Sequence, residues 1–294
     1  MSSHVSNVAS DLFATPPSSP LYHYTSIDAV LKIVPDAALW ATEIHYFNDS
    51  SELAHAVEFF VREARTLRDA AAYENDMLSQ LIDWLRGRLA HGNMLFVTCF
   101  SEEGNLLSQW RGYTPHAQGV SLGFSDEHLL ACVGWQRFEL GQCIYDCDSK
   151  RRIASATVRA IAECAVAVGP SADAHPSQSF HPAFAAVEPD LLRISALLKH
   201  EAFKAEREWR AVSSAVTNYI ADDIQYRAGR STLVPHIPFI LSLASDTGVP
   251  LERVYLGPSP ETNLAMSALS GFLGKNKAAP KCRIVSSGIP YRET

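Results

Sequence analysis

The chain consists of short apolar runs that alternate, at irregular intervals, with segments of helical periodicity. Strands are expected over residues 21–25, 38–42, 94–101, 119–125, 141–146, 206–212, 224–228, 253–257 and 282–288. Helices are expected over residues 27–34, 51–88 with a break near 70–76, 149–168, 188–203, 236–245 and 262–273. Because the helices are unequal in length and do not follow every strand, this order predicts an α+β fold rather than a regular parallel α/β fold. We expect mixed, largely antiparallel sheets flanked by helices.

The composition is that of a chain able to bury a sizeable core. Of the 294 residues, 47% are hydrophobic and 10% are aromatic, which argues against disorder. The first 20 residues are rich in Ser, Pro and Ala and lack the basic and apolar regions of a secretory signal. We therefore expect residues 1–20 to be a flexible leader and residues 21–294 to form a single domain.

Charge and cysteine content bear on partners and compartment. The formal net charge of −7 gives no general attraction for nucleic acid or for an anionic membrane. No apolar stretch approaches the roughly 18 residues of a membrane span. The six cysteines show no second pair at the spacing of a zinc site, which indicates thiols in a reducing compartment. These features predict a cytoplasmic protein that does not bind membranes.

The stretch "FKAEREWRAV", residues 203–212, places an unusual density of charge on an expected strand. Side chains alternate in a strand, so Glu206, Glu208 and Arg210 share one face, opposite Trp209. Two carboxylates at this spacing lie about 7 Å apart and repel by roughly 2 kcal/mol at an effective dielectric near 20. If they are buried, one pKa should rise unless Arg210 compensates. The face is either a solvated ladder or the wall of an active site.

The motif "YHYTS" places a histidine between two tyrosines at the end of the first expected strand. His23 is either a core residue with its hydrogen bonds satisfied or a ligand-binding residue. The hydroxyl of Thr25 or of Ser26 is in position to cap the helix expected over 27–34.

The motif "HYFNDSSE" precedes the longest expected helix. Asp49 and Glu52 stand three residues apart, the spacing of a capping box, and that role accounts for both acids. It leaves Tyr46, Phe47 and Asn48 unexplained, and an aromatic pair before a turn could instead line a pocket.

The motif "CFSEEGNLLSQWRGY" joins an apolar strand to a polar loop. Ser101 lies at the strand end, and Trp110 and Arg111 follow in the loop, where functional residues concentrate. The pair could stack on an aromatic ligand and bind its phosphate, or be a buried Trp anchor with a structural Arg.

Taken together with "GVSLGF", "EREWR" and "VYLGP", these motifs resemble the DUF2971 family from about Leu21 to Arg292. Their layout also resembles the ADP-ribosyltransferase superfamily. There, a His or Arg lies on the first strand, a Ser or Tyr in a second motif, and a Glu on a late strand. "TCFS" departs from the usual Ser-Thr-Ser pattern of the second motif, and Tyr46 competes with Ser101 for that position. The resemblance implies an ADP-ribosyltransferase-like fold.

The second resemblance implies an enzyme that cleaves the nicotinamide–ribose bond of NAD and transfers ADP-ribose to an unknown protein or nucleic-acid acceptor, without a metal. Glu208 would stabilise the oxocarbenium-like state, and Glu206 would orient the acceptor or a water. The expected NAD-binding residues are His23, Tyr24, Thr25, Tyr46, Ser101, Trp110, Arg111 and Arg210. Within that set, Tyr46 would stack on nicotinamide, Ser101 would support Glu208, and Arg111 or Arg210 would offset the pyrophosphate charge.

Two other functions remain open at this point. One is a non-enzymatic module that binds a nucleotide or a protein partner. The other is a phosphodiesterase or nuclease that holds a divalent metal with Asp49, Glu52 and Glu208. Metal dependence separates this last function from NAD chemistry.

Overall fold

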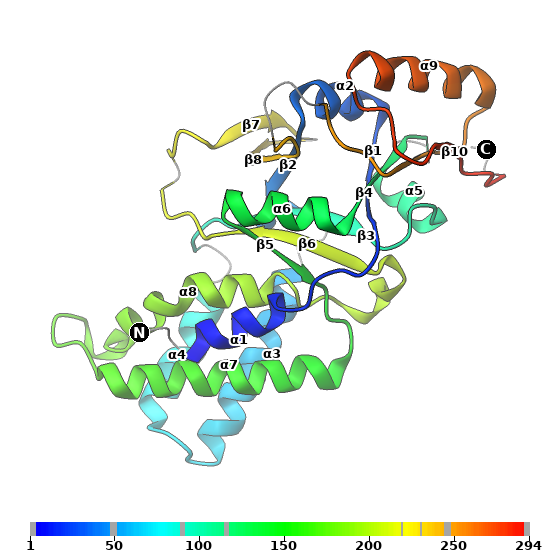
Figure 1. Ribbon diagram of the computed structural model, residues 1–294. Helices are drawn as coiled ribbons and strands as arrows, with labels where there is room; N and C mark the ends of the chain where they lie inside the picture. The colour runs from blue at the N-terminus through cyan, green and yellow to red at the C-terminus, as the bar shows by residue number, and fades with distance from the viewer. Residues whose placement is uncertain are drawn as a thin grey trace.

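The computed structural model describes residues 4–47, 52–88, 92–114, 118–218, 220–229, 231–243 and 248–290 (Figure 1). Helices flank a largely antiparallel open sheet, so the expected α+β class is confirmed. The only parallel pair among the described strands is β9 with β10.

A ten-stranded sheet runs through the structure in the order β10-β9-β4-β1-β3-β2-β8-β7, with β6 joined to β3 and β5 joined to β6. The strands are β1 (Leu21–Thr25), β2 (Ala38–Glu43), β3 (Phe96–Ser101), β4 (Val120–Phe124), β5 (Phe138–Gln142), β6 (Glu208–Ser213), β7 (Gln225–Ala228), β8 (Leu233–Ile240), β9 (Arg253–Leu256) and β10 (Ile284–Ser286).

Helices cover both faces of this sheet and enclose two apolar cores (Figure 1). The larger helical layer contains α1 (His4–Phe13), α3 (Glu52–Asp69), α4 (Asn75–Arg88), α7 (Cys147–Val168) and α8 (His181–Ser195). It packs on the face of β3 and β6 that carries Val97 and Val212. The opposite face, with Phe96 and Trp209, packs against α2 (Ile27–Asp36), α6 (Asp126–Gln136) and α9 (Thr262–Lys275). The short helix α5 (Leu107–Tyr113) lies beside β1.

Strand β3 is the point at which the sheet divides. Its first residues pair with β2, where Val97 lies opposite Thr42. Its last residue, Ser101, pairs with Tyr22 of β1. Because β2 and β1 meet opposite ends of β3, they diverge on either side of its middle, while β6 pairs with β3 from Val97 to Ser101. This change of partner opens the sheet where the candidate site lies.

Most strands expected from the sequence are present, but the helix expected over residues 236–245 is wrong at its start. Residues 236–240 belong to β8, which pairs with β2 on one side and with β7 on the other. Pro235 and Pro238 disfavour a helix because proline lacks a backbone N–H donor and clashes with the preceding turn. The β-branched Val234 and Ile237 favour a strand.

The flexible-leader expectation was wrong for the residues that form α1. Val5 and Ala9 are completely buried, and Val8 and Leu12 pack against the same core, which places an apolar stripe at helical spacing on α7 and α8. Two further differences concern helices. Helices α5 and α6 were not expected, and α8 begins and ends earlier than the helix expected over 188–203.

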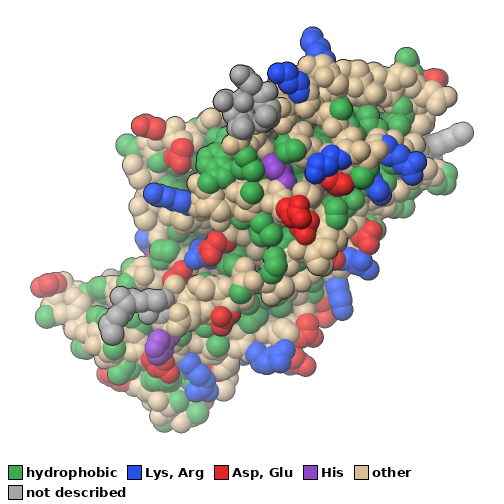
Figure 2. Space-filling model, viewed as in Figure 1, with side chains coloured by type: hydrophobic (Ala, Val, Ile, Leu, Met, Phe, Trp, Pro, Cys, Tyr) green, Lys and Arg blue, Asp and Glu red, His purple; other side chains and the backbone are tan. Residues whose placement is uncertain are grey.

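No helix within the described part of the chain is long and apolar enough to cross a membrane. On the face shown in Figure 2, acidic and basic side chains are interspersed over both halves of the molecule and do not gather into one basic patch.

Candidate functional site

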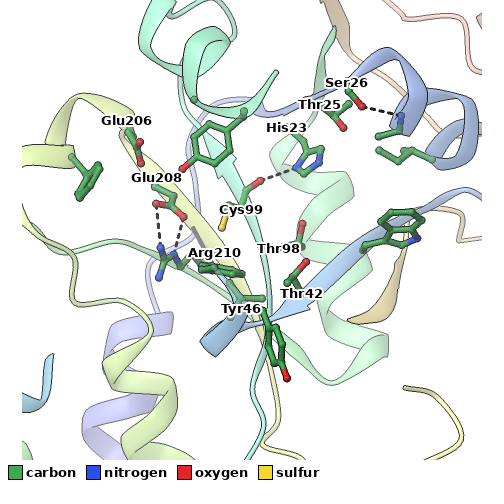
Figure 3. A pocket seen from close by; sticks show the side chains of 18 of the residues that line it. His23, Thr25, Ser26, Thr42, Tyr46, Thr98, Cys99, Glu206, Glu208 and Arg210 are labelled. Carbon is green, nitrogen blue, oxygen red and sulfur yellow. Dashed lines mark hydrogen bonds and ion pairs between the residues drawn. The ribbon is translucent and has the colours of Figure 1, made fainter. Parts of the chain in front are cut away.

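A cavity of about 1040 Å³ lies where β1 and β2 diverge on either side of β3. Its walls come from segments that are far apart in the sequence, including β1, β2, β3, β6 and β7, the start of α2, the end of α5 and the segment before β6 (Figure 3). The volume is at the upper end of the range for small-molecule sites. The cavity is therefore large enough for a nucleotide.

Strand β6 supplies the charged wall of this cavity. Glu208 and Arg210 line it, whereas the alternating residues Trp209 and Ala211 are buried in the apolar core on the opposite face. Of the two alternatives considered from the sequence for this charged face, the placement agrees with a cavity wall and not with a solvated ladder. All six residues of β6 are buried.

Two carboxylates and two cations form a compact cluster at this wall, which we call the ion quartet: Lys199, Glu206, Glu208 and Arg210. Lys199 Nζ lies 2.6 Å from Glu206 Oε2 and also contacts Glu208 Oε2. Arg210 Nε donates to Glu208 Oε1 at 2.8 Å, and Arg210 Nη1 donates to the Ala196 carbonyl at 2.7 Å. Both oxygens of Glu208 therefore contact a cation.

The backbone between the two glutamates is not the regular strand expected from the sequence. Glu206 ends a short 3-10 helix, η4 (Glu201–Glu206), and Arg207 has φ 45° and ψ 51°, the left-handed conformation. This conformation is uncommon for a residue other than glycine. The turn brings Glu206 and Glu208 to the same cation, Lys199, although they are separated by one residue.

The protonation of Glu208 is set by opposing effects. Burial raises its pKa, but the charges of Arg210 and Lys199 together lower it by more, so the pKa falls from 4.5 to about 2. The rise considered from the sequence does not occur at Glu208, because Arg210 and Lys199 compensate. Glu208 is therefore a carboxylate at neutral pH.

His23 sits at the divergence of the sheet. Its Nδ1 lies 2.9 Å from the Cys99 carbonyl in the middle of β3. A carbonyl only accepts, so Nδ1 carries the proton and Nε2 is an acceptor when the ring is neutral. Burial lowers the pKa of His23, which favours that neutral form. The His23 ring thus donates a hydrogen bond to the backbone of β3 and also lines the cavity.

Aromatic rings line much of the cavity. Tyr46 lies in the 3-10 helix η1 (Ile44–Tyr46) and is partly exposed, and Phe47 follows it with its ring 5.5 Å from the Arg210 guanidinium carbon. The other ring-bearing residues of the lining are His23, Trp40, Tyr113 and Phe203. Such rings offer stacking surfaces for a planar ligand.

Several predicted site residues do come together. His23, Thr25, Tyr46, Glu206, Glu208 and Arg210 all line the cavity. Figure 3 shows His23, Tyr46 and Glu208 on three different elements around the cavity. Ser26, expected as one of two possible caps, accepts from the Ala29 N–H at 3.1 Å and also lines the cavity.

Ser101 lies next to the cavity but does not line it. Its Oγ donates to the Glu206 carbonyl at 2.7 Å and accepts from the Glu103 N–H, while its backbone lies opposite Glu208. Ser101 therefore holds the backbone that carries the two glutamates.

Tyr24 and Trp110 belong to a separate buried cluster, with ring centroids 4.8 Å apart. The Trp110 indole donates to Asn105 Oδ1, and the Tyr24 hydroxyl bridges Glu103 and Leu106. Trp110 is thus the buried anchor that was one of its two possible roles. Arg111 is exposed on α5 and is not part of the cavity lining.

The structure adds residues that the sequence did not indicate, chiefly Lys199, Trp40, Thr98 and Arg227. Lys199 was expected on a helix, and no local pattern marks a lysine that will be buried between two carboxylates. Arg227 was expected on a strand, but its place in the cavity lining depends on the pairing of β7 with β8.

The proposed acidic set of the phosphodiesterase reading is incompletely described. Asp49 lies outside the described residues, and so does the side chain of Glu52, whose backbone begins α3. The capping box therefore stays a prediction. Across the described ranges, no group of three or more His, Cys, Asp or Glu side chains is arranged to hold a metal ion.

Residues 109–211 match the sequence model of a family described as "Protein of unknown function (DUF2971)". The match supports the resemblance to that family, and it spans the cavity residues from Gly112 to Arg210, including the ion quartet. No curated protein matches this chain, and no solved structure matches it.

Proposed function

We propose that the protein is an ADP-ribosyltransferase-like enzyme that cleaves the nicotinamide–ribose bond of NAD and transfers ADP-ribose to a macromolecular acceptor. The observation that carries this proposal is the convergence of His23, Tyr46, Glu206 and Glu208 on one nucleotide-sized cavity. They come from β1, η1, η4 and β6, in the order that the superfamily resemblance implies.

The chemistry requires a carboxylate beneath the ribose. Cleavage of the nicotinamide–ribose bond passes through an oxocarbenium-like state, and a fixed negative charge favours that state over the uncharged sugar. Glu208 has the required charge because its pKa is about 2. Arg210 and Lys199 hold the carboxylate in one orientation. Such preorganisation lowers the cost of reorienting charge during the reaction.

The remaining roles follow from position. Glu206 is the less buried glutamate of the ion quartet, so it is the one available to orient an acceptor or a water. The neutral His23 ring offers Nε2 as an acceptor for a ribose hydroxyl. Tyr46 and Phe47 provide aromatic faces for nicotinamide.

One observation favours a second candidate, a nucleotide-binding module without catalytic activity. Both Glu208 oxygens already contact cations, which offset much of the negative charge that an oxocarbenium would need. In that case the ion quartet would serve to shape the cavity, and NAD would bind without being cleaved.

The test is nicotinamide release from NAD by the purified protein, with and without a cell extract that supplies an acceptor. The Glu208→Gln variant removes the charge but keeps the shape, so release should fall by roughly 10²-fold or more, the scale of losing one preorganised electrostatic group. Glu188→Gln is the matched control, because Glu188 is a buried carboxylate paired with an arginine outside the cavity. It should retain wild-type release.

A second variant covers the case in which Glu208→Gln does not fold. Glu208→Asp keeps the charge and withdraws it by one methylene, so it should fold while release falls. Equal release by a folded Glu208 variant and by the wild type would remove Glu208 from the mechanism. Binding of NAD by the wild type without any release would instead support the binding module.

A further inference from the structure

The three cations that line the cavity differ in how their charge is balanced. Lys199 and Arg210 are paired within the ion quartet. Arg227, on the edge strand β7, has no carboxylate within ion-pair distance among the residues that the structure describes. The cavity therefore has a neutralised side at β6 and a positively charged side at β7.

The guanidinium of Arg227 makes few polar contacts. Its Nη2 donates to Thr42 Oγ1 at 3.4 Å, a long hydrogen bond, and its Nε is buried without a partner. Its carbon lies 5.8 Å from the centroid of the Trp40 ring. A guanidinium presents five N–H donors in a planar fork, which matches the oxygens of a phosphate.

Thr98 provides an independent observation at the same side of the cavity. Its side chain is almost fully buried, its Oγ1 has no hydrogen-bond partner, and it lines the cavity. A buried hydroxyl without a partner costs free energy, which a ligand oxygen would recover. Figure 3 shows Thr98 of β3 next to Thr42 of the adjoining strand β2, where the backbone of Thr42 pairs with Val97.

Trp40 is in contact with a second cation and with a histidine. Lys32 Nζ lies 5.1 Å from the Trp40 ring centroid, on a ring that Arg227 also contacts. His236 lies 4.9 Å from the same ring, and burial together with the nearby Arg227 charge lowers its pKa. His236 is therefore neutral at neutral pH. The cation that lines the cavity beside Trp40 is Arg227.

We propose that Arg227, Thr42 and Thr98 form a phosphate subsite beside Trp40, so that the cavity takes phosphorylated nucleosides in preference to nucleosides. This inference rests on the proposed function in that it places the pyrophosphate of NAD across β3 from Glu208. The two arginines considered from the sequence do not fill this role, because Arg111 is not part of the lining and Arg210 is bound to Glu208.

The test compares binding of AMP, ADP-ribose and adenosine by isothermal titration calorimetry. The wild type should bind AMP and ADP-ribose more tightly than adenosine. Arg227→Gln should weaken the two phosphorylated ligands by roughly ten- to hundredfold, the scale of one hydrogen bond to a charged group, and change adenosine binding less than about twofold. Arg227→Lys should fall between, because it keeps the charge and loses the fork.

Arg253→Gln is the matched control. Arg253 also lies on a strand and also contacts an aromatic residue, donating to the Tyr255 hydroxyl, but it is not part of the cavity lining. Its binding of all three ligands should equal that of the wild type. Melting curves of each variant check that Arg227→Gln remains folded without the contact between Arg227 and Trp40.

The outcomes separate this inference from the proposed function. An Arg227-dependent preference for AMP in a protein that releases no nicotinamide supports the subsite and contradicts the enzyme. Nicotinamide release with an unchanged KM for NAD in Arg227→Gln supports the enzyme and overturns the subsite. Equal weakening of AMP and adenosine by Arg227→Gln also overturns it, since Arg227 would then act only through Trp40. No binding of any of the three ligands at millimolar concentration overturns it as well.

Discussion

The helical layer and the cavity wall each bury a glutamate against an arginine, but they do so differently. On α8, the Glu188 side chain is 1% exposed, while its partner Arg88 is 50% exposed, and the Asn93 N–H also donates to Glu188. On β6, Glu208 is 5% exposed and its partner Arg210 is 2% exposed. The first pair keeps its cation in water, whereas the second withdraws both charges from it.

The difference bears on what each pair does for the protein. Taking two ions out of water costs several kcal/mol per ion, and their attraction repays this only with good geometry and further hydrogen bonds. The ion quartet supplies that geometry by placing two cations against two carboxylates. An apolar wall would not require the desolvation of ions, so stability alone does not account for the ion quartet.

The largest effect expected from this comparison is on stability. Glu208→Gln leaves Lys199 and Arg210 with one carboxylate between them, so the free energy of unfolding should fall by about 3–5 kcal/mol. Glu188→Gln keeps an acceptor for the Asn93 N–H and leaves Arg88 hydrated, so about 1 kcal/mol is expected. Urea unfolding of both variants measures the two losses. Similar losses would show that the two pairs are energetically equivalent.

The pH dependence sharpens the same comparison. The pKa of Glu208 is about 2, below its ordinary value of 4.5, so its ion pairs stabilise the folded protein fully above pH 4.5. This contribution is lost as the pH falls through 2, where Glu208 becomes protonated. The stability gap between the wild type and Glu208→Gln should therefore narrow progressively from pH 4.5 to pH 2. A gap that stays constant over this range would mean that the charge of Glu208 is not what stabilises the fold.

Patterns of neighbouring residues correctly predicted the elements whose formation depends mainly on those residues. Strand β1 and the cap at Ser26 follow from an apolar run and a hydroxyl before a helix, and both are present. At residues 236–240 a strand replaces the expected helix, because Pro235 and Pro238 disfavour the helix that the apolar residues alone would allow.

The candidate site was harder to predict because its contacts are set by tertiary structure. The convergence of Glu206 with Glu208 depends on the left-handed conformation of Arg207, which an arginine rarely adopts. The cation between them, Lys199, follows the end of α8, and nothing in its neighbouring residues marks it as buried. The sequence left two roles open for His23, a core residue or a ligand-binding residue. The division of the sheet at β3 gives its ring both a backbone partner and a place in the cavity lining.

The smallest effect concerns two threonines, one in each region. Thr98 on β3 and Thr157 on α7 are both buried, and neither Oγ1 has a hydrogen-bond partner. Replacing either by valine removes a hydroxyl that is desolvated without compensation, so each variant should be unchanged or more stable by up to about 1 kcal/mol. Thermal unfolding of the two variants checks this shared expectation.

Ligand binding should then distinguish the two positions. Thr98 lines the cavity and Thr157 does not, so Thr98→Val should weaken AMP binding by roughly three- to tenfold, the net worth of one hydrogen bond, while Thr157→Val should leave it unchanged. Adenosine binding should be the same in both variants, because the hydroxyl of Thr98 is expected to meet a phosphate oxygen. If Thr98→Val and Thr157→Val bind AMP alike, the unpartnered hydroxyl on the cavity wall is a packing defect of the same kind as the one in the helical layer, and the phosphate would contact Arg227 without it.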